Sequence, residues 1–169
     1  MLHSRRLDRA LAVLNHRGGS ACDLHLYLNL DEKNSMTIEL WSLLSVTAIL
    51  WIAILVQQLQ LDITGGAKYA LSNREQGYSF KEATALTGRL ARNVRNHVEG
   101  LALFAPLVLT AAIANISNTW TQSAAIAFSV TRGLHFFFYA AGITPFRSFA
   151  WGIGFFLALG SFVFGLITG

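Results

Sequence analysis

The chain has 169 residues, of which 53% are hydrophobic and only 13% are charged. A soluble domain of this length would have about a quarter of its residues charged, so the composition excludes an ordinary soluble domain and indicates an integral membrane protein. The formal net charge of +4 does not indicate nucleic-acid binding, because the basic residues lack the aromatic neighbours of a nucleic-acid surface.

Residues 1–35 form a polar tail that differs from the rest of the chain. Leu7, Ala10, Leu11 and Leu14 have helical spacing, which is compatible with a short amphipathic helix. The tail lacks the uninterrupted apolar core of a signal peptide. Two interpretations stay open: a poorly ordered tail or short surface helix, or a start assigned upstream of the true one at Met36. The second is favoured, because a well-formed membrane protein begins at Met36.

Disulfide and metal chemistry have no signature in the sequence. Cys22 is the single cysteine, so an internal disulfide is excluded. The histidines of the tail, His3, His16 and His25, are scattered and have no cysteine partners with zinc-ligand spacing. We therefore predict no metal site.

The first membrane span is predicted at 38–60. A hydrocarbon core of about 30 Å needs about 20 apolar residues, and this segment supplies them. Glu39 lies in its first turn, where a carboxylate suits the positive end of the helix dipole. Gly65 and Gly66 are predicted to stop the helix, and residues 62–86 are predicted to form a mostly irregular polar loop.

The second helix is predicted from about Thr84 to Asn115, with its membrane span at 96–116. On a helical wheel, one face carries a polar stripe that we list as Arg89, Arg92, Asn93, Asn96 and Glu99, with Arg95 at its edge. His97 falls on the remaining, apolar surface. Ionisable groups at membrane depth are costly unless they face a bundle interior or a wet cavity, so the stripe is a candidate site.

The third and fourth spans are predicted at 123–143 and 146–167. Arg132, His135 and Tyr139 are spaced i, i+3, i+7 and share one face of the third span. Thr144-Pro145 predicts the turn between the two spans, and Arg147 and Ser148 follow it. The fourth span has glycines at positions suited to close helix packing, namely Gly152, Gly154, Gly160 and Gly165.

The distribution of basic residues predicts the orientation. They concentrate at 61–97 and beside the 143–147 turn, and are absent from the turn between the second and third spans. We therefore predict that these two regions are cytoplasmic and that Met36 and the C-terminus are outside. The basic tail at 1–35 disagrees with this orientation.

Each polar group also has a structural alternative. Arg89, Arg92 and Arg95 could flank the membrane and reach lipid headgroups. Glu99 and Arg132 are too deep for that, and their alternative is an interhelical ion pair that fixes packing.

The polar residues of the third and fourth spans have alternatives of the same kind. His135 could be a hydrogen-bonded bundle histidine, Tyr139 an interface anchor, and Arg147 a positive flank of the fourth span.

Together, the polar groups suit a small, charged, amphipathic ligand. Arginines hold carboxylates by bidentate bonds, Glu99 can accept an ammonium group, and Asn96 can bond a peptide group. Glutathione has carboxylates, an amine, amides and a thiol, and therefore fits this set.

Two stretches, RLARNVRNHVEGLALFAP at 89–106 and RGLHFFFYAAGITPFR at 132–147, resemble the MAPEG family, the membrane-associated proteins in eicosanoid and glutathione metabolism. The resemblance covers about residues 36–169 and is stronger to bacterial members than to the eukaryotic eicosanoid enzymes. It implies an all-α, four-helix membrane bundle in the bacterial inner membrane, a homotrimer, and glutathione bound between neighbouring protomers near the cytoplasmic side.

The resemblance also implies residue roles. The residues that match the glutathione-contacting helix are Arg89, Arg92, Asn96 and Glu99, and those that match the facing helix are Arg132, His135 and Tyr139. Arg147 and Ser148 resemble the Arg-Ser pair near the thiol in some members, so they are the candidate catalytic residues. After Arg92 this chain has Asn93, where alanine would be expected from the resemblance.

The implied function is a glutathione-dependent transferase or peroxidase that acts on lipophilic electrophiles, with membrane lipid and a hydrophobic small molecule as partners and no nucleic acid. The alternative is a non-catalytic membrane binding or scaffolding protein with the same pocket. A small transporter is less favoured, because the sequence has no internal repeat and no pair of broken helices.

Overall fold

The computed structural model describes residues 36–71, 73 and 84–169, with backbone alone for 67–70. The helices are α3 (Ile38–Ala70), α4 (Ala85–Ala114), α5 (Thr119–Ala141), α6 (Thr144–Gly152), the π-helix η1 (Ile153–Ala158) and α7 (Leu159–Thr168). The predicted tail at 1–35 lies outside the described residues. The predicted 62–86 loop lies outside them as well from residue 71 on, apart from 71, 73 and 84–86.

Four stretches of helix are long and apolar enough to cross a membrane. They are Ile38–Gly66, Ala85–Ala114, Thr119–Ala141 and Thr144–Thr168, the last being α6, η1 and α7 in succession. The described residues contain no strand. The prediction of an all-α membrane protein with four spans is therefore confirmed.

Three predicted boundaries were wrong. The third helix begins at Thr119, four residues before the predicted 123, because Asn118 caps it there. The first helix does not end with the apolar run near residue 60 but continues through Asp62 to Gly66, where φ is 70° and the chain kinks before Ala70. The turn before the fourth span lies at Gly142 and Ile143, since Thr144 is already helical with Pro145 in the first turn. Proline is compatible with the first turn of a helix because the amide it lacks would have no intrahelical acceptor there.

The ends of α4 and α5 are set by local polar groups. Thr84 caps α4, accepting a hydrogen bond from the Thr87 amide at 3.3 Å, and Asn115 ends it in the left-handed conformation. Asn118 caps α5, accepting from the amides of Trp120 and Thr121 at 3.0 Å each. The N-terminal caps satisfy amides that have no acceptor inside the helix, and only the four residues 115–118 separate the two helices.

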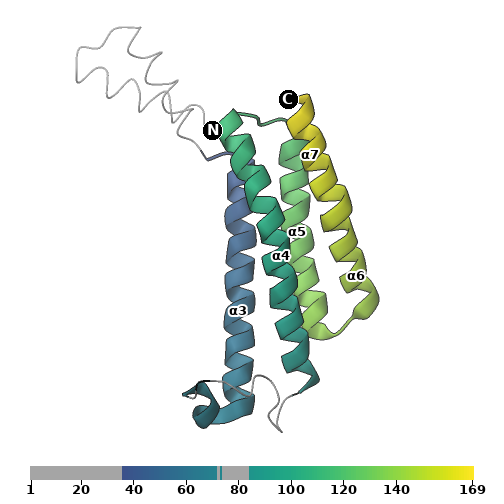
Figure 1. Ribbon diagram of the computed structural model, residues 1–169. Coiled ribbons are helices and arrows are strands. Elements are labelled where there is room, and N and C mark those ends of the chain that lie inside the picture. Colours follow the sequence, from purple (N-terminus) through teal and green to yellow (C-terminus); the bar gives the residue numbers. More distant parts are fainter. Residues whose placement is uncertain (1–35, 72, 74–83) are drawn as a thin grey trace, which may run out of the picture. The chain divides into compact units, whose positions relative to one another are not determined.

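Helix α5 is central and contacts every other helix (Figure 1). The core is built on Phe104, Phe128 and Phe162, from α4, α5 and α7, each 0% exposed. The ring of Phe104 stacks on Phe128 at 4.4 Å and meets Phe162 edge-on at 5.9 Å. The outward faces carry large exposed apolar side chains, among them Trp51, Leu59, Ile113, Phe149, Phe156 and Ile167. Such side chains suit a surface that contacts lipid.

The bundle has two ends, visible in Figure 1. We call the loop end the one where α3 and α5 finish and α4 and α6 begin, near Gly66, Ala85, Ala141 and Thr144. The far end is the one near Ile38, Ala114, Thr119 and Thr168.

The predicted close-packing glycines divide into two groups. Gly154 and Gly165 are buried against α5, and a Cβ at Gly154 would lie 2.6 Å from the Thr131 hydroxyl oxygen. A Cβ at Gly152 or Gly160 would meet nothing within 4 Å in the protomer. Within one protomer these two glycines therefore do not lie at a close helix contact, contrary to the prediction.

Candidate functional site

The polar stripe of α4 is divided between two environments. Asn93 is 0% exposed and faces the inside of the bundle together with His97, which is also 0% exposed. Arg92 and Glu99 lie on the exposed side of the helix. The prediction that Asn93 shares one face with Arg92 and Glu99, and that His97 lies on the remaining surface, was therefore wrong. Asn93 lies three residues after the buried Leu90, and His97 lies three residues before the buried Gly100. All four residues therefore share the inward face of α4.

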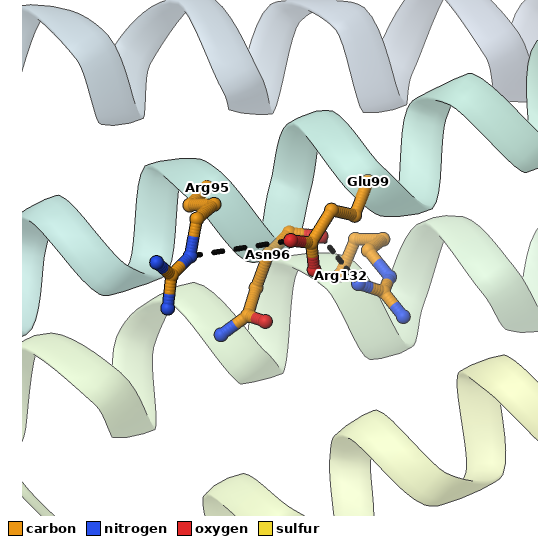
Figure 2. Close-up of polar contacts among 4 residues, drawn as sticks. All are labelled: Arg95, Asn96, Glu99 and Arg132. Carbon is orange, nitrogen blue, oxygen red and sulfur yellow. Dashed lines mark hydrogen bonds and ion pairs between the residues drawn. The ribbon is translucent and has the colours of Figure 1, made fainter.

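The exposed side of α4 carries an ion pair within the helix (Figure 2). The Arg95 Nε lies 4.0 Å from a Glu99 carboxylate oxygen, and the two side chains are 73% and 64% exposed. Figure 2 also shows Arg132 of α5, whose Nη1 donates to the Asn96 backbone carbonyl at 3.5 Å. Among the described residues, no interhelical ion pair joins Glu99 and Arg132, so that structural alternative does not hold within the protomer.

Arg132 is a buried cation without an anionic partner in the described protomer. It is 1% exposed, and its Nε and Nη2 have no hydrogen-bond partner among the described residues. The guanidinium lies 4.7 Å over the Phe128 ring. The guanidinium packs closely on Gly100, where a Cβ would come within 2.8 Å of the Arg132 Nη1 and the arginine side chain would have to shift.

Ring contacts lead from the Arg132 level toward the loop end. The His135 ring lies 5.3 Å from that of Tyr139, edge to face. The Arg147 guanidinium lies 4.5 Å over the Tyr139 ring. Such cation–π contacts contribute about 0.5–2 kcal/mol, and this one holds the first turn of α6 against the last turn of α5.

A pocket of about 170 Å³ opens at this place. Its lining consists of Asn96, His135, Tyr139, Arg147, Ser148 and Trp151. It therefore combines one polar residue of α4, two of α5 and two of α6, all of them predicted site residues. The Ser148 hydroxyl donates to the Thr144 carbonyl of its own helix at 3.3 Å.

Trp151 is the pocket residue that was not among the predicted site residues. Its ring stacks on Phe155 at 4.9 Å and meets Phe156 edge-on at 5.9 Å. An interface tryptophan is common in membrane helices, so nothing in its local sequence marked it. The available signal was its spacing, since it lies one helical turn after Arg147.

Four predicted ligand residues lie outside the pocket of the single protomer. Arg92 and Glu99 are on the exposed face of α4. Arg89 is half-buried beside Gly142, where an added Cβ would lie 3.3 Å from the guanidinium carbon. Arg132 does not line the pocket, but is joined to it through the Asn96 carbonyl.

A second buried polar group lies at the far end. Glu39 of α3 is 2% exposed and accepts hydrogen bonds from the hydroxyl of Thr121 and from that of Ser117 at 3.1 and 3.2 Å. Glu39 lies in the first turn of α3 and bonds to the first turn of α5. The positive ends of both helix dipoles therefore favour its carboxylate.

Metal ligands are not gathered anywhere in the part of the chain that the structure describes. No group of three or more His, Cys, Asp and Glu side chains there could hold an ion. The pocket is instead a set of hydrogen-bond donors and cations, which suits an anionic organic ligand.

Comparison with known protein families matches residues 38–167 to the MAPEG family. Comparisons with curated proteins and with solved structures gave no significant match. The matched range takes in all four membrane spans and every residue of the pocket. This chain belongs to the MAPEG family, and it is an integral membrane protein.

Proposed function

We propose that this protein is a glutathione-dependent membrane enzyme, a transferase or peroxidase that acts on lipophilic electrophiles in the bacterial inner membrane. The observation that carries the proposal is the position of Arg147 in the wall of the pocket, 4.5 Å over the Tyr139 ring. MAPEG membership supports a function in glutathione or eicosanoid metabolism.

The donors of the site fit glutathione. Arg132 has two guanidinium nitrogens without partners, which suits a carboxylate, and the Asn96 side chain in the pocket wall suits a peptide group. Glu99, on the exposed face of α4, is proposed to accept the amine.

A homotrimer with sites between neighbouring protomers is part of the proposal. Arg92 and Glu99 are exposed on a helix that is long and apolar enough to cross a membrane, and charges there are costly against lipid. The pocket of one protomer, about 170 Å³, is smaller than the roughly 300–1,000 Å³ of small-molecule sites. A neighbouring protomer would cover the exposed charges and enlarge the site.

The chemistry follows from the thiolate, which is the nucleophilic form of a thiol. Arg147 lies in the first turn of α6, where its charge and the helix dipole both favour an anion. In a transferase the thiolate attacks an electrophilic carbon, an S–C bond forms, and the leaving group departs with its electron pair. In a peroxidase the thiolate attacks the terminal oxygen of a hydroperoxide, the O–O bond breaks, and the alkoxide takes up a proton to give an alcohol. The resulting sulfenic acid then condenses with a second glutathione to give the disulfide and water.

The test uses the purified full chain in lipid nanodiscs. Calorimetry measures glutathione binding, and absorbance follows conjugation of a chromogenic aryl halide or reduction of a lipid hydroperoxide. S-methylglutathione is the matched control ligand, because it should bind and give no product. Binding with turnover supports the enzyme, binding without turnover favours the non-catalytic alternative, and no binding overturns the glutathione assignment.

A further inference from the structure

A row of polar side chains runs along the inner face of α4, through Arg89, Asn93 and His97. Successive members are four residues apart, so they lie above one another at about one helical turn, ~5.4 Å. Asn93 and His97 are 0% exposed, while Arg89 is half-buried at the loop end beside Gly142. The row thus begins near the surface and ends deep in the bundle.

The polar atoms of this row have no hydrogen-bond partners among the described residues. They are the Arg89 Nε, the Asn93 Oδ1 and Nδ2, and both ring nitrogens of His97. A buried polar group left unpaired costs about 1–3 kcal/mol, and native proteins contain few of them. Within the part of the protomer that the structure describes, no protein group bonds these five atoms, so a partner of another kind is needed there.

Water is the ligand that fits this row. Buried waters typically form about three hydrogen bonds to otherwise unsatisfied polar groups. Asn93 offers a donor and an acceptor, and a neutral histidine offers one of each, so both can bond a water from either side. None of the three side chains of the row, Arg89, Asn93 and His97, is acidic, so the row is unsuited to binding a cation.

The deep end of the row reaches the pocket through His135. The His97 and His135 rings have centroids 5.6 Å apart, with no hydrogen bond between them among the described residues. The Nδ1 of His135 is also buried and unpartnered, while His135 itself lines the pocket. The charged or titratable groups that act electrostatically on His97 are His135 and Arg132, both on α5.

We propose that this row holds a chain of internal waters, and that His97 and these waters carry the thiol proton from the pocket to the surface at the loop end. The proposal rests on the proposed function. When the thiol ionises, its S–H bond breaks and sulfur keeps the electron pair. The proton passes to a ring nitrogen of His135, then through water to His97, and past Asn93 to solvent near Arg89.

The water row is tested first, without glutathione, by radiolytic hydroxyl labelling of the full chain in nanodiscs. Waters bound beside His97 and His135 should give these residues at least tenfold faster oxidation than Phe104 and Phe162, which are equally buried at 0% exposed. Labelling of the two histidines at the rate of these phenylalanines would overturn the proposal, whatever the outcome of the glutathione assays.

Proton transfer is tested by rapid mixing with glutathione in weak buffer, following thiolate absorbance and a pH dye. We expect His97→Phe to slow both signals at least tenfold, with final amplitudes and glutathione affinity within twofold of the parent protein. His97→Gln keeps a polar side chain but cannot take up the proton, so it should retain labelling at His135 and still be slow. Ser42→Ala, at a buried polar site on α3, is the matched control and should change neither signal.

Unchanged rates in both His97 variants would overturn proton conduction. If His97→Phe does not fold, as judged by thermal unfolding, the rate of His97→Gln decides the result. A parent protein that binds no glutathione would overturn the proposed function, and with it the conduction step, while the labelling experiment separately decides whether the waters are there.

Discussion

Glu39 and Arg132 are both buried in this bundle, at 2% and 1% exposed, yet their surroundings differ. Glu39 at the far end has both carboxylate oxygens bonded by hydroxyls of Ser117 and Thr121. Arg132 has one long hydrogen bond, to a backbone carbonyl, and two nitrogens without partners among the described residues.

We interpret Glu39 as a structural polar group, and the proposed function makes Arg132 the one kept for a ligand. A buried polar group that is fully bonded stabilises a fold and fixes its register, whereas a partly bonded one destabilises it. Stability is commonly lower where a site must stay ready to bind. Substitutions at the far end should therefore change stability, and those near the pocket should change binding or turnover.

The largest expected effect is at Arg147. Arg147→Ala should lower turnover about 10²- to 10³-fold, as for one lost electrostatic donor, and should move the thiolate absorbance of bound glutathione to higher pH, with affinity largely kept. Arg147→Lys should restore part of the rate, since it supplies the charge without the planar fork. Unchanged turnover and an unshifted thiol titration in Arg147→Ala would remove Arg147 from the mechanism.

Glu39→Ala tests the far end. It removes the carboxylate that accepts from the hydroxyls of Thr121 and Ser117, leaving the buried Thr121 hydroxyl only the Asn118 carbonyl at 3.0 Å, and the free energy of unfolding should fall by about 1–3 kcal/mol. Thermal unfolding in detergent measures the loss, and turnover per folded molecule should not change. An unaltered melting temperature would mean that Glu39 is not the structural group the comparison requires.

Glu99→Gln removes charge and keeps shape on the exposed side of α4. If Glu99 receives the ligand amine, affinity should fall about tenfold to a hundredfold, the equivalent of about 1.5–3 kcal/mol for a hydrogen bond to a charged group. Calorimetry measures the affinity and native mass spectrometry the assembly. Arg95→Gln, which removes the other member of the exposed ion pair, is the matched control. Loss of assembly with unchanged affinity per site would favour a packing role.

Arg132→Met is expected to have the smallest effect on stability. The direction in which it changes the melting temperature is the informative result. It replaces an unpaired buried cation by an apolar side chain, which is commonly neutral or stabilising, so the melting temperature should hold or rise. Glutathione affinity should fall about tenfold. A clear loss of stability would show that Arg132 already has a structural partner, and would end the contrast with Glu39.

The length of the apolar segments predicted four spans, and these must be helical here because any backbone that crosses lipid must satisfy its own hydrogen bonds. The ends of α4 were also predicted from sequence, since Thr84 and Asn115 are local capping residues. The predicted stop at Gly65 and Gly66 agrees with the kink at Gly66, but the helical conformation of the residues from Asp62 to the kink was missed, because polar residues beyond an apolar run look like a loop when no packing partner is known.

The amino-acid sequence by itself determined the membrane class, the number of spans and the spacing of polar residues on each helix, because these depend on composition and on the repeat of a single helix. The tertiary structure alone decided which polar residues turn inward. A helical wheel gives the angle between Asn93 and Glu99 around the helix axis, but not which of the two residues faces a neighbouring helix. Likewise Glu39 and Thr121 are 82 residues apart, and only the packing of α3 on α5 makes one the partner of the other.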